Sequence, residues 1–301
     1  TNIIAGGGNL SIGAAVGAAI GVTHVANTVD AAVVGNAEIE SQSGNVNVIA
    51  RAGGLERRDG DDVLCNEDAA ISVCAYQGGG SIGLSLGAAV ATNSVVNEVR
   101  ARAARGVSLV AGGSQGINLH AQDETSVYAE AQGYTVGQVA AGAIVATAVK
   151  KGSTAAILGQ DAGGQGAQSV TRGGLSVIAE RSGRVEAFTI AGSGGVVSGN
   201  GSVATAEDDG DVTARISDQM TIEAQGKAVQ VIARAVPQTS ATARGYQGSI
   251  YASVGASVAV ARALPRVTAS IGYGGMIKAG SLELRGLVLL GETHSAESFA
   301  E

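Results

Sequence analysis

Few residues in this chain have types and spacings that could do chemistry. The pentapeptide Gly-X-Ser-X-Gly, which places the nucleophile of many hydrolases on a strand-to-helix turn, occurs at 83–87 and at 112–116. With 47 glycines in 301 residues such matches arise by chance, and Ser85 falls inside an expected strand. Residues 78–83 match the glycine pattern of dinucleotide sites, but a strand rather than a helix is expected to follow, which leaves a phosphate without a helix N-terminus. We therefore predict no catalytic residue and no enzyme activity.

Metal ligands are the next candidates. Carboxylates crowded in a loop can hold calcium, and two clusters qualify: Asp59, Asp61, Asp62, Glu67 and Asp68, and then Glu207, Asp208, Asp209 and Asp211. Both are expected in glycine-containing turns, where solvation is the ordinary state. We predict no cofactor and no metal site, with calcium as the open alternative. His24, His120 and His294 stand apart from one another, so no zinc site is expected. Paired carboxylates could also serve a glycosidase, but the sequence presents no aromatic platform for a sugar.

The amino-acid composition limits the kinds of core and of partner that the chain could have. The chain has 2 Phe, 6 Tyr and no Trp, so its core must consist of Val, Ile, Leu and Ala. The net charge is −7 and no basic stripe is present, which argues against nucleic-acid binding. The longest apolar stretch, 10–22, is much shorter than the about 20 residues of a membrane helix, so this segment is not expected to insert into a membrane.

Internal repeats organise the chain. The strand-like segment 46–51 recurs three times, with alanines at 50, 121, 179 and 233, so the intervals are 71, 58 and 54 residues. A weaker fifth copy spans 282–286. We predict one repeat domain, 1–301, with about five degenerate repeats at approximately 6–77, 78–132, 133–190, 191–247 and 248–301, and we expect it to be a segment of a longer protein.

The segment 12–22 decides between strand and helix. Bulky apolar residues alternate with Gly, Ala and Ser, and 82–90 and 250–260 repeat the pattern. This is the period of a strand, and each interior glycine would cost a helix about 1 kcal/mol. We expect Val16, Leu86 and Val254 to point into the core, and Gly17, Gly87 and Gly255 to form a bare outer face. Residues 136–149 lose the alternation and could form a short Ala-rich helix, and 192–201 look like a loop or bulge.

Alternating strands at a fixed repeat are typical of stacked coils, each bonded to the next. The predicted fold is therefore all-β: an elongated parallel β-solenoid (β-helix). Whether each repeat is one wide coil or about three small rungs stays open.

These features resemble a known group of proteins. The strand 81–90, the Asn-containing segment 93–97 and the Val-X-Val-X-Ala strand are similar to repeats of giant bacterial surface adhesins, autotransporter passengers and filamentous-haemagglutinin-like exoproteins. The resemblance implies a rigid stalk or adhesive fibre, extracellular or at the bacterial cell surface. Its partners would be a host or neighbouring cell surface, matrix or glycan, with self-association also open. The alternatives are a polysaccharide lyase or hydrolase on the same scaffold and a self-assembling filament subunit.

The first repeat carries 13 to 17 extra residues, which fall between Gly53 and Ala69. Loops inserted between coils are tolerated and often bind partners. The candidate binding residues are Arg57, Arg58, Asp59, Asp61 and Asp62. A solvated decoration is the equal alternative. Cys65 and Cys74 are the two cysteines of the chain, and in an exported protein such a pair is usually bridged. We predict a disulfide between them, with two free buried thiols as the alternative.

Overall fold

The computed structural model describes residues 2–53, 69–104, 106–160, 168–171, 173–290 and 294–300. Within these ranges the chain forms 18 strands and no helix, and every strand pairing is parallel. The predicted all-β class is confirmed.

The strands belong to three sheets. The first sheet has eight: β1 (Asn2–Ser11), β2 (Ala14–Val33), β5 (Ile71–Ser81), β6 (Leu84–Ala104), β9 (Val127–Gln160), β12 (Arg184–Ile216), β15 (Gln238–Ile271) and β18 (His294–Ala300). The second has five short strands: β3 (Glu38–Ser41), β7 (Ser108–Ala111), β10 (Gln168–Thr171), β13 (Thr221–Glu223) and β16 (Met276–Lys278). The third also has five: β4 (Val46–Gly53), β8 (Ile117–Glu124), β11 (Leu175–Arg181), β14 (Ala228–Ala235) and β17 (Ser281–Val288).

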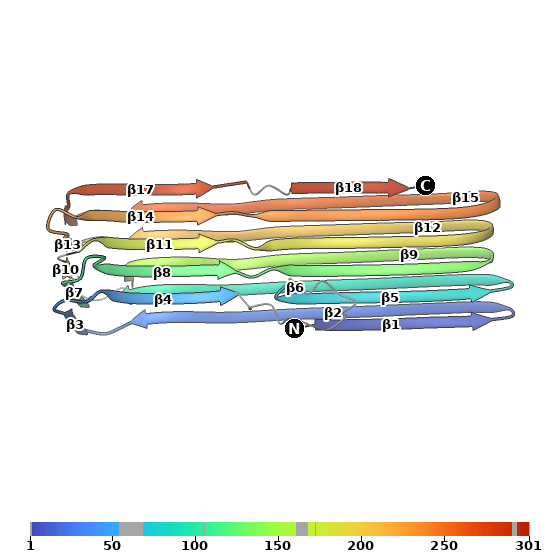
Figure 1. Cartoon of the computed structure of the whole chain (residues 1–301), viewed down its shortest axis with the longest axis horizontal. Coiled ribbons are helices and arrows are strands. Elements are labelled where there is room, and N and C mark those ends of the chain that lie inside the picture. The colour runs from blue at the N-terminus through green and yellow to red at the C-terminus, as the bar shows by residue number, and fades with distance from the viewer. Residues whose placement is uncertain are drawn as a thin grey trace.

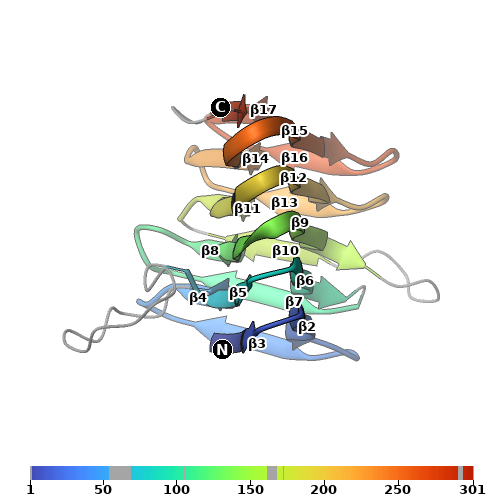
Figure 2. The same cartoon turned by 90° about the vertical axis from the view of Figure 1, so that its right-hand side faces the viewer.

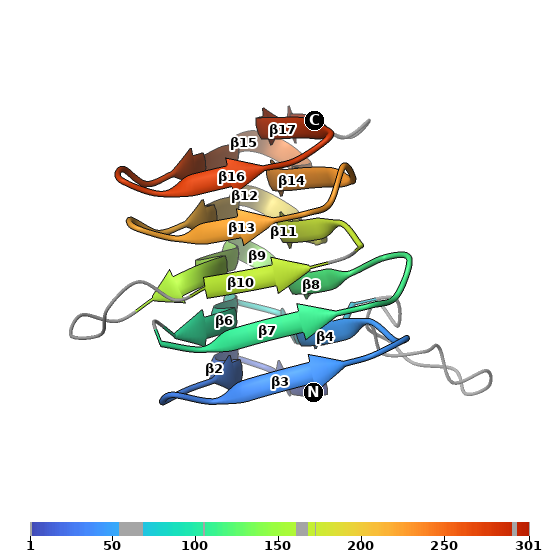
Figure 3. The same cartoon turned by 90° about the vertical axis from the view of Figure 1, so that its left-hand side faces the viewer.

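The chain visits the three sheets in one fixed order and then returns to the first. The long strands lie stacked in Figure 1, from blue at the N-terminus to red at the C-terminus, and Figure 2 shows the same stack in profile. The short strands of the second sheet lie across one end of the long strands, and this end faces the viewer in Figure 3. The alanines at 50, 121, 179 and 233 lie in register across the third sheet, which confirms the alignment of the repeated segments.

The first sheet turns back on itself and forms two facing layers. The front layer holds β1, β5, β18 and the first part of β9, β12 and β15, and the back layer holds β2, β6 and the second part of those three strands. Between these layers lies one buried cluster, composed largely of alanine. A second buried cluster, richer in Val, Leu and Ile, lies toward the second and third sheets.

The predicted direction of the bulky side chains is wrong. Val16 is 65% exposed and Val254 76% exposed, whereas Ala89, one residue from the outward Ala88, is fully buried. The reason is the close approach of the two layers. A Cβ added at Gly87 would lie 2.3 Å from Oε1 of Gln77 in the facing strand, so a larger side chain has no room at this position. Val16, Leu86 and Val254 therefore point outward.

The two irregular repeats are also strands. Residues 136–149 lie within β9, so the helix considered for them does not form. Residues 192–201 lie within β12, and the register with β15 shifts between Gly195 and Val197, which confirms a bulge there. Among the described residues no helix exists that could cross a membrane.

Candidate functional site

The charged insertion lies outside the described residues. This holds for Arg57, Arg58, Asp59, Asp61 and Asp62, and also for Cys65. Cys74, on β5, is disulfide-bonded and fully buried. Its pairing with Cys65 stays a prediction.

The second acidic cluster does not form a turn, which corrects the expectation for it. Its residues lie on β12, so alternate carboxylates point to opposite sides. Glu207 points outward, 3.3 Å from Nζ of Lys151, and Asp211 lies 3.0 Å from Nε of Arg266. Asp208 points inward and is 2% exposed. The strand thus separates Asp208 from Glu207, Asp209 and Asp211, which share the outer side.

The remaining sequence candidates stay apart. Ser85 lies within β6 and is fully buried, so it is not a serine presented at a turn. Nε2 of His120 lies 3.3 Å from Oε2 of Glu180 on the neighbouring strand, an ordinary surface contact. Within the described parts of the chain no three His, Cys, Asp or Glu side chains are placed to hold a metal ion together.

The front layer gathers most of the aromatic residues on its outer side, which the sequence analysis missed. Of the six Tyr and two Phe in the chain, six lie at outward positions of β5, β9, β12, β15 and β18. We call this surface the aromatic face, and its rings are Tyr76, Tyr128, Tyr134, Phe188, Tyr246 and Phe299. Aromatic rings offer a large apolar area with little conformational freedom to lose, which suits a binding surface.

A buried carboxylate organises the centre of this face. Glu130 is 7% exposed, accepts a hydrogen bond of 2.8 Å from the hydroxyl of Tyr128, and accepts a second from the amide of Gln132. Burial, together with the charge of Glu130, raises the pKa of Tyr76 to about 12. The same two causes raise the pKa of Tyr128 far above its usual range. Both phenols therefore stay neutral hydrogen-bond donors at physiological pH.

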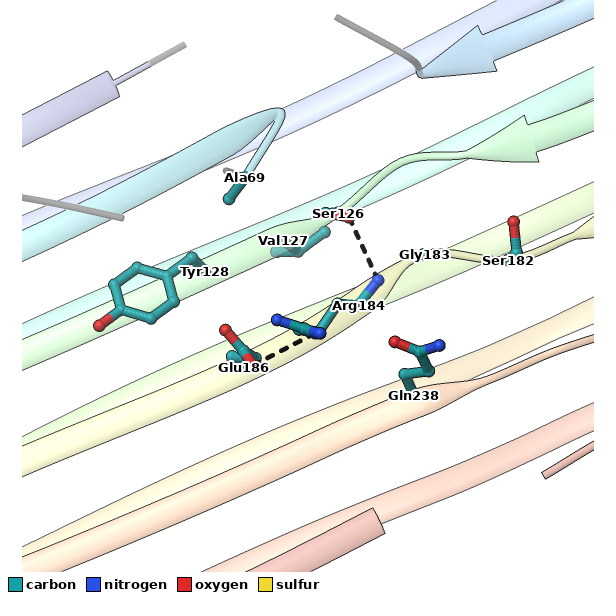
Figure 4. Close-up of a pocket in the computed structure, with 9 residues that line it drawn as sticks. All are labelled: Ala69, Ser126, Val127, Tyr128, Ser182, Gly183, Arg184, Glu186 and Gln238. Atoms are coloured by element: carbon teal, nitrogen blue, oxygen red, sulfur yellow. Dashed lines mark hydrogen bonds and ion pairs between the residues drawn. The ribbon is translucent and has the colours of Figure 1, made fainter. Parts of the chain in front are cut away.

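A hollow of about 440 Å³ opens on the same face where the chain passes from the third sheet to the first. Figure 4 shows its lining, with Tyr128, Glu186 and Gln238 around Arg184. Ser126 Oγ accepts a hydrogen bond of 3.2 Å from the backbone amide of Arg184, and Arg184 Nε lies 3.5 Å from Oε1 of Glu186. The hollow thus offers both a cation and carboxylate oxygens beside a ring.

A second hollow, of about 560 Å³, lies toward the C-terminal end of the face, lined in part by Tyr246, Glu297 and Phe299. Arg244 also lines it, and the guanidinium carbon of Arg244 lies 5.8 Å from the ring centre of Phe188, within cation–π range. Ring, cation and carboxylate therefore occur together in both hollows of the aromatic face.

Two exposed rings lie in line along the stack. Tyr134 is 48% exposed and Tyr246 40% exposed, and both are in register with Gly192 on the strand between them. At ordinary strand spacing the two positions are about 10 Å apart. The glycine leaves room for a ring: a Cβ at Gly192 would lie 2.4 Å from the ring of Tyr134. A signal for this pair exists in the sequence, because Gly133-Tyr134 and Gly245-Tyr246 occupy equivalent positions of two repeats.

A buried ionic network separates the two apolar clusters. Asp123 Oδ2 lies 3.3 Å from Nζ of Lys150 and 3.2 Å from Nη1 of Arg181, and Arg181 Nη2 lies 2.7 Å from Oδ1 of Asp208. All four side chains are at most 2% exposed. Asn97 adds a hydrogen bond of 3.2 Å to Oδ1 of Asp123. Two cations balance two anions here, and the network joins strands of successive repeats.

The pKa values in the network follow from burial and pairing. Burial alone would raise the pKa of Asp123, but Lys150 and Arg181 outweigh it and hold that pKa below its ordinary value. Burial lowers the pKa of Lys150, and Asp123 opposes this shift. Because the network is enclosed, its role is to position strands rather than to bind a ligand.

Comparison with protein-family models, with curated proteins and with solved structures finds no match to this chain.

Proposed function

We propose that the chain is a β-solenoid module that serves as a rigid, adhesive element outside a bacterial cell or at its surface. The observation that carries the proposal is the parallel, in-register pairing of long strands from one repeat to the next. In such a stack each repeat contacts only its neighbours, so length can grow while the cross-section stays constant. A stalk or fibre needs this property.

We further propose that the aromatic face is its attachment surface. The rings of Tyr134 and Tyr246 are exposed and aligned along the stacking direction, which favours an extended ligand lying along the stack. Hydrogen-bonding groups line both hollows of the face. Flat apolar rings beside charged and amide groups suit a glycan, which has both apolar ring faces and many hydroxyls.

The charged segment is proposed to contribute at one edge of this surface. Ala69, which follows residues 54–68 directly, lines the hollow at Tyr128. Cys74 lies in register with Glu130, the carboxylate at the centre of the face. Arg57, Arg58, Asp59, Asp61 and Asp62 are thus joined in sequence to the proposed attachment surface.

Replacing both exposed tyrosines by alanine (Tyr134→Ala with Tyr246→Ala) should weaken attachment by about 5- to 150-fold, because each lost ring contact is worth about 0.5–1.5 kcal/mol. Binding of the purified protein to immobilised acidic and neutral polysaccharides, measured as retention over a concentration series, checks this. Tyr273→Ala is the matched control, since Tyr273 is 75% exposed but lies in the turn between β15 and β16.

Unchanged retention of the double variant, with its circular dichroism intact, would exclude the aromatic face as the attachment surface. An equal loss in Tyr273→Ala would mean that any exposed ring suffices. The same incubations also address the enzyme alternative, because a lyase or hydrolase would release new reducing ends from the polysaccharide, whereas an adhesive module would leave it intact.

A further inference from the structure

The outer side of the back layer is an unpartnered aliphatic surface. It spans the positions in register with residues 14–22, on β2, β6, β9, β12 and β15. The side chains are exposed even on strands that are paired along both edges: Leu86 is 37% exposed, Val139 48% and Val197 42%. No charged side chain occupies these positions. We call this surface the aliphatic face.

The aliphatic face is corrugated along the stacking direction. One column of in-register positions holds only small residues and forms a trough: Ala18, Ala88, Ala143, Gly201 and Ala256. Two residues further along each strand, a column of β-branched residues forms a ridge: Ile20, Val90, Val145, Val203 and Val258. The trough is open, since a Cβ at Gly201 would meet no atom within 4 Å.

The area of the aliphatic face is close to that of a protein–protein interface. Five strands at ordinary spacing and nine residues along each cover about 700 Å². The largest apolar patch of a typical monomer is about 300–600 Å², and a stable interface takes about 800 Å² from each partner. The aliphatic face is thus larger than the largest apolar patch of a typical monomer and close to the area that one partner contributes to a stable interface.

We propose that the aliphatic face packs against the same face of a second copy of this chain, with the two stacks side by side and pointing in the same direction. The corrugation selects this arrangement. A two-fold axis parallel to the stack and midway between the two columns places each ridge in the partner's trough, repeat opposite repeat. An axis along the strands would instead bring ridge against ridge.

The charges around the aliphatic face are compatible with a second copy of the chain as partner. Several outward charged residues further along the same strands are paired within the chain: Arg102 with Asp30 at 2.9 Å, Lys151 with Glu207 at 3.3 Å, and Arg266 with Asp211 at 3.0 Å. A second copy therefore meets an apolar surface bordered by charges of both signs, and no field of one sign opposes its approach.

Sedimentation equilibrium of the intact protein should show a species of twice the 29.4 kDa chain mass. Val145→Lys places a charge on the ridge and should raise the dimer dissociation constant at least about 100-fold. Ala143→Leu fills the trough and should weaken the dimer as well, although it adds apolar area. The control is Ile49→Lys, at a position 44% exposed on β4 outside this face, which should leave the dimer unchanged.

Orientation is tested by mixing variants that each carry one added cysteine, under mild oxidation. Ala18→Cys mixed with Ile20→Cys should give an intermolecular disulfide, because trough and ridge of the same repeat meet. Ala18→Cys mixed with Val258→Cys, from opposite ends of the stack, should not. A protein that stays monomeric, a dimer strengthened by Ala143→Leu, or cross-linking only in the second mixture would each overturn the proposal. Circular dichroism of every variant confirms that the strands are retained.

Discussion

Replacing Arg181 with leucine should lower the free energy of unfolding by about 3–5 kcal/mol, because it leaves two buried carboxylates with one cation. Arg181 holds Asp123 and Asp208 at once, at 3.2 Å and 2.7 Å, and the three side chains are at most 2% exposed. Urea unfolding followed by circular dichroism measures the change. The matched control is Arg266→Leu: Arg266 pairs with Asp211 but is 78% exposed, so its loss should cost less than about 1 kcal/mol.

The same variant should shift acid unfolding. The folded-state pKa of Asp123 lies below its unfolded value, so its contribution to stability is present above the ordinary carboxyl pKa and is lost as the pH falls through the lowered value. Without Arg181 the pKa of Asp123 rises, and the acid transition should move to higher pH. Equal stability losses in Arg181→Leu and Arg266→Leu would show that the network is solvated rather than buried.

Two neighbouring alanines should respond very differently to the same substitution. Ala89→Asp buries a carboxylate without a partner between the two layers and should cost about 4 kcal/mol or more, enough to prevent folding of that repeat. Ala88→Asp places the same group on the outer side and should cost less than about 1 kcal/mol. Urea unfolding at a concentration that keeps the native protein monomeric gives both values. The reverse order would mean that the bulky residues point inward.

The strands were predictable because bulky and small residues alternate along the sequence with a period of two residues. Alternation of Val16, Ile20 and Val22 with glycine and alanine indicates a strand whatever its surroundings. The alignment of the repeats was predictable too, since the alanines at 50, 121, 179 and 233 lie in register as expected.

The direction of the faces was not predictable from the alternation. A two-residue period shows that two faces differ, but not which one is buried. The hydrophobic effect alone favours Leu86 inside, yet beside it the space between the layers is already filled: the side chain of Gln77 lies 2.3 Å from the Cβ position of Gly87. The spacing between the layers is a property of the assembled sheets.

The sites were missed for a related reason, because their residues meet only across repeats. Tyr134 and Tyr246 are more than a hundred residues apart, and the four charges of the ionic network lie on four strands. The network does leave a trace in the sequence. Lys150 follows Ala146 and Ala148, and Asp208 follows Ala204 and Ala206, so each charge occupies the next position of a buried row. A charge that continues such a row predicts a buried partner.

Thiol accessibility along β6 tests the arrangement of the two faces most directly. Single cysteines would replace Leu86, Ala88 and Val90 at outward positions, and Ala89 and Ala91 at fully buried ones. Alkylation of the native, monomeric protein should be fast at the first three and at least about 100-fold slower at the last two, since these react only when the layers separate. Slow reaction at 86, 88 and 90 with fast reaction at 89 and 91 would contradict both the buried alanine layer and the exposed aliphatic face.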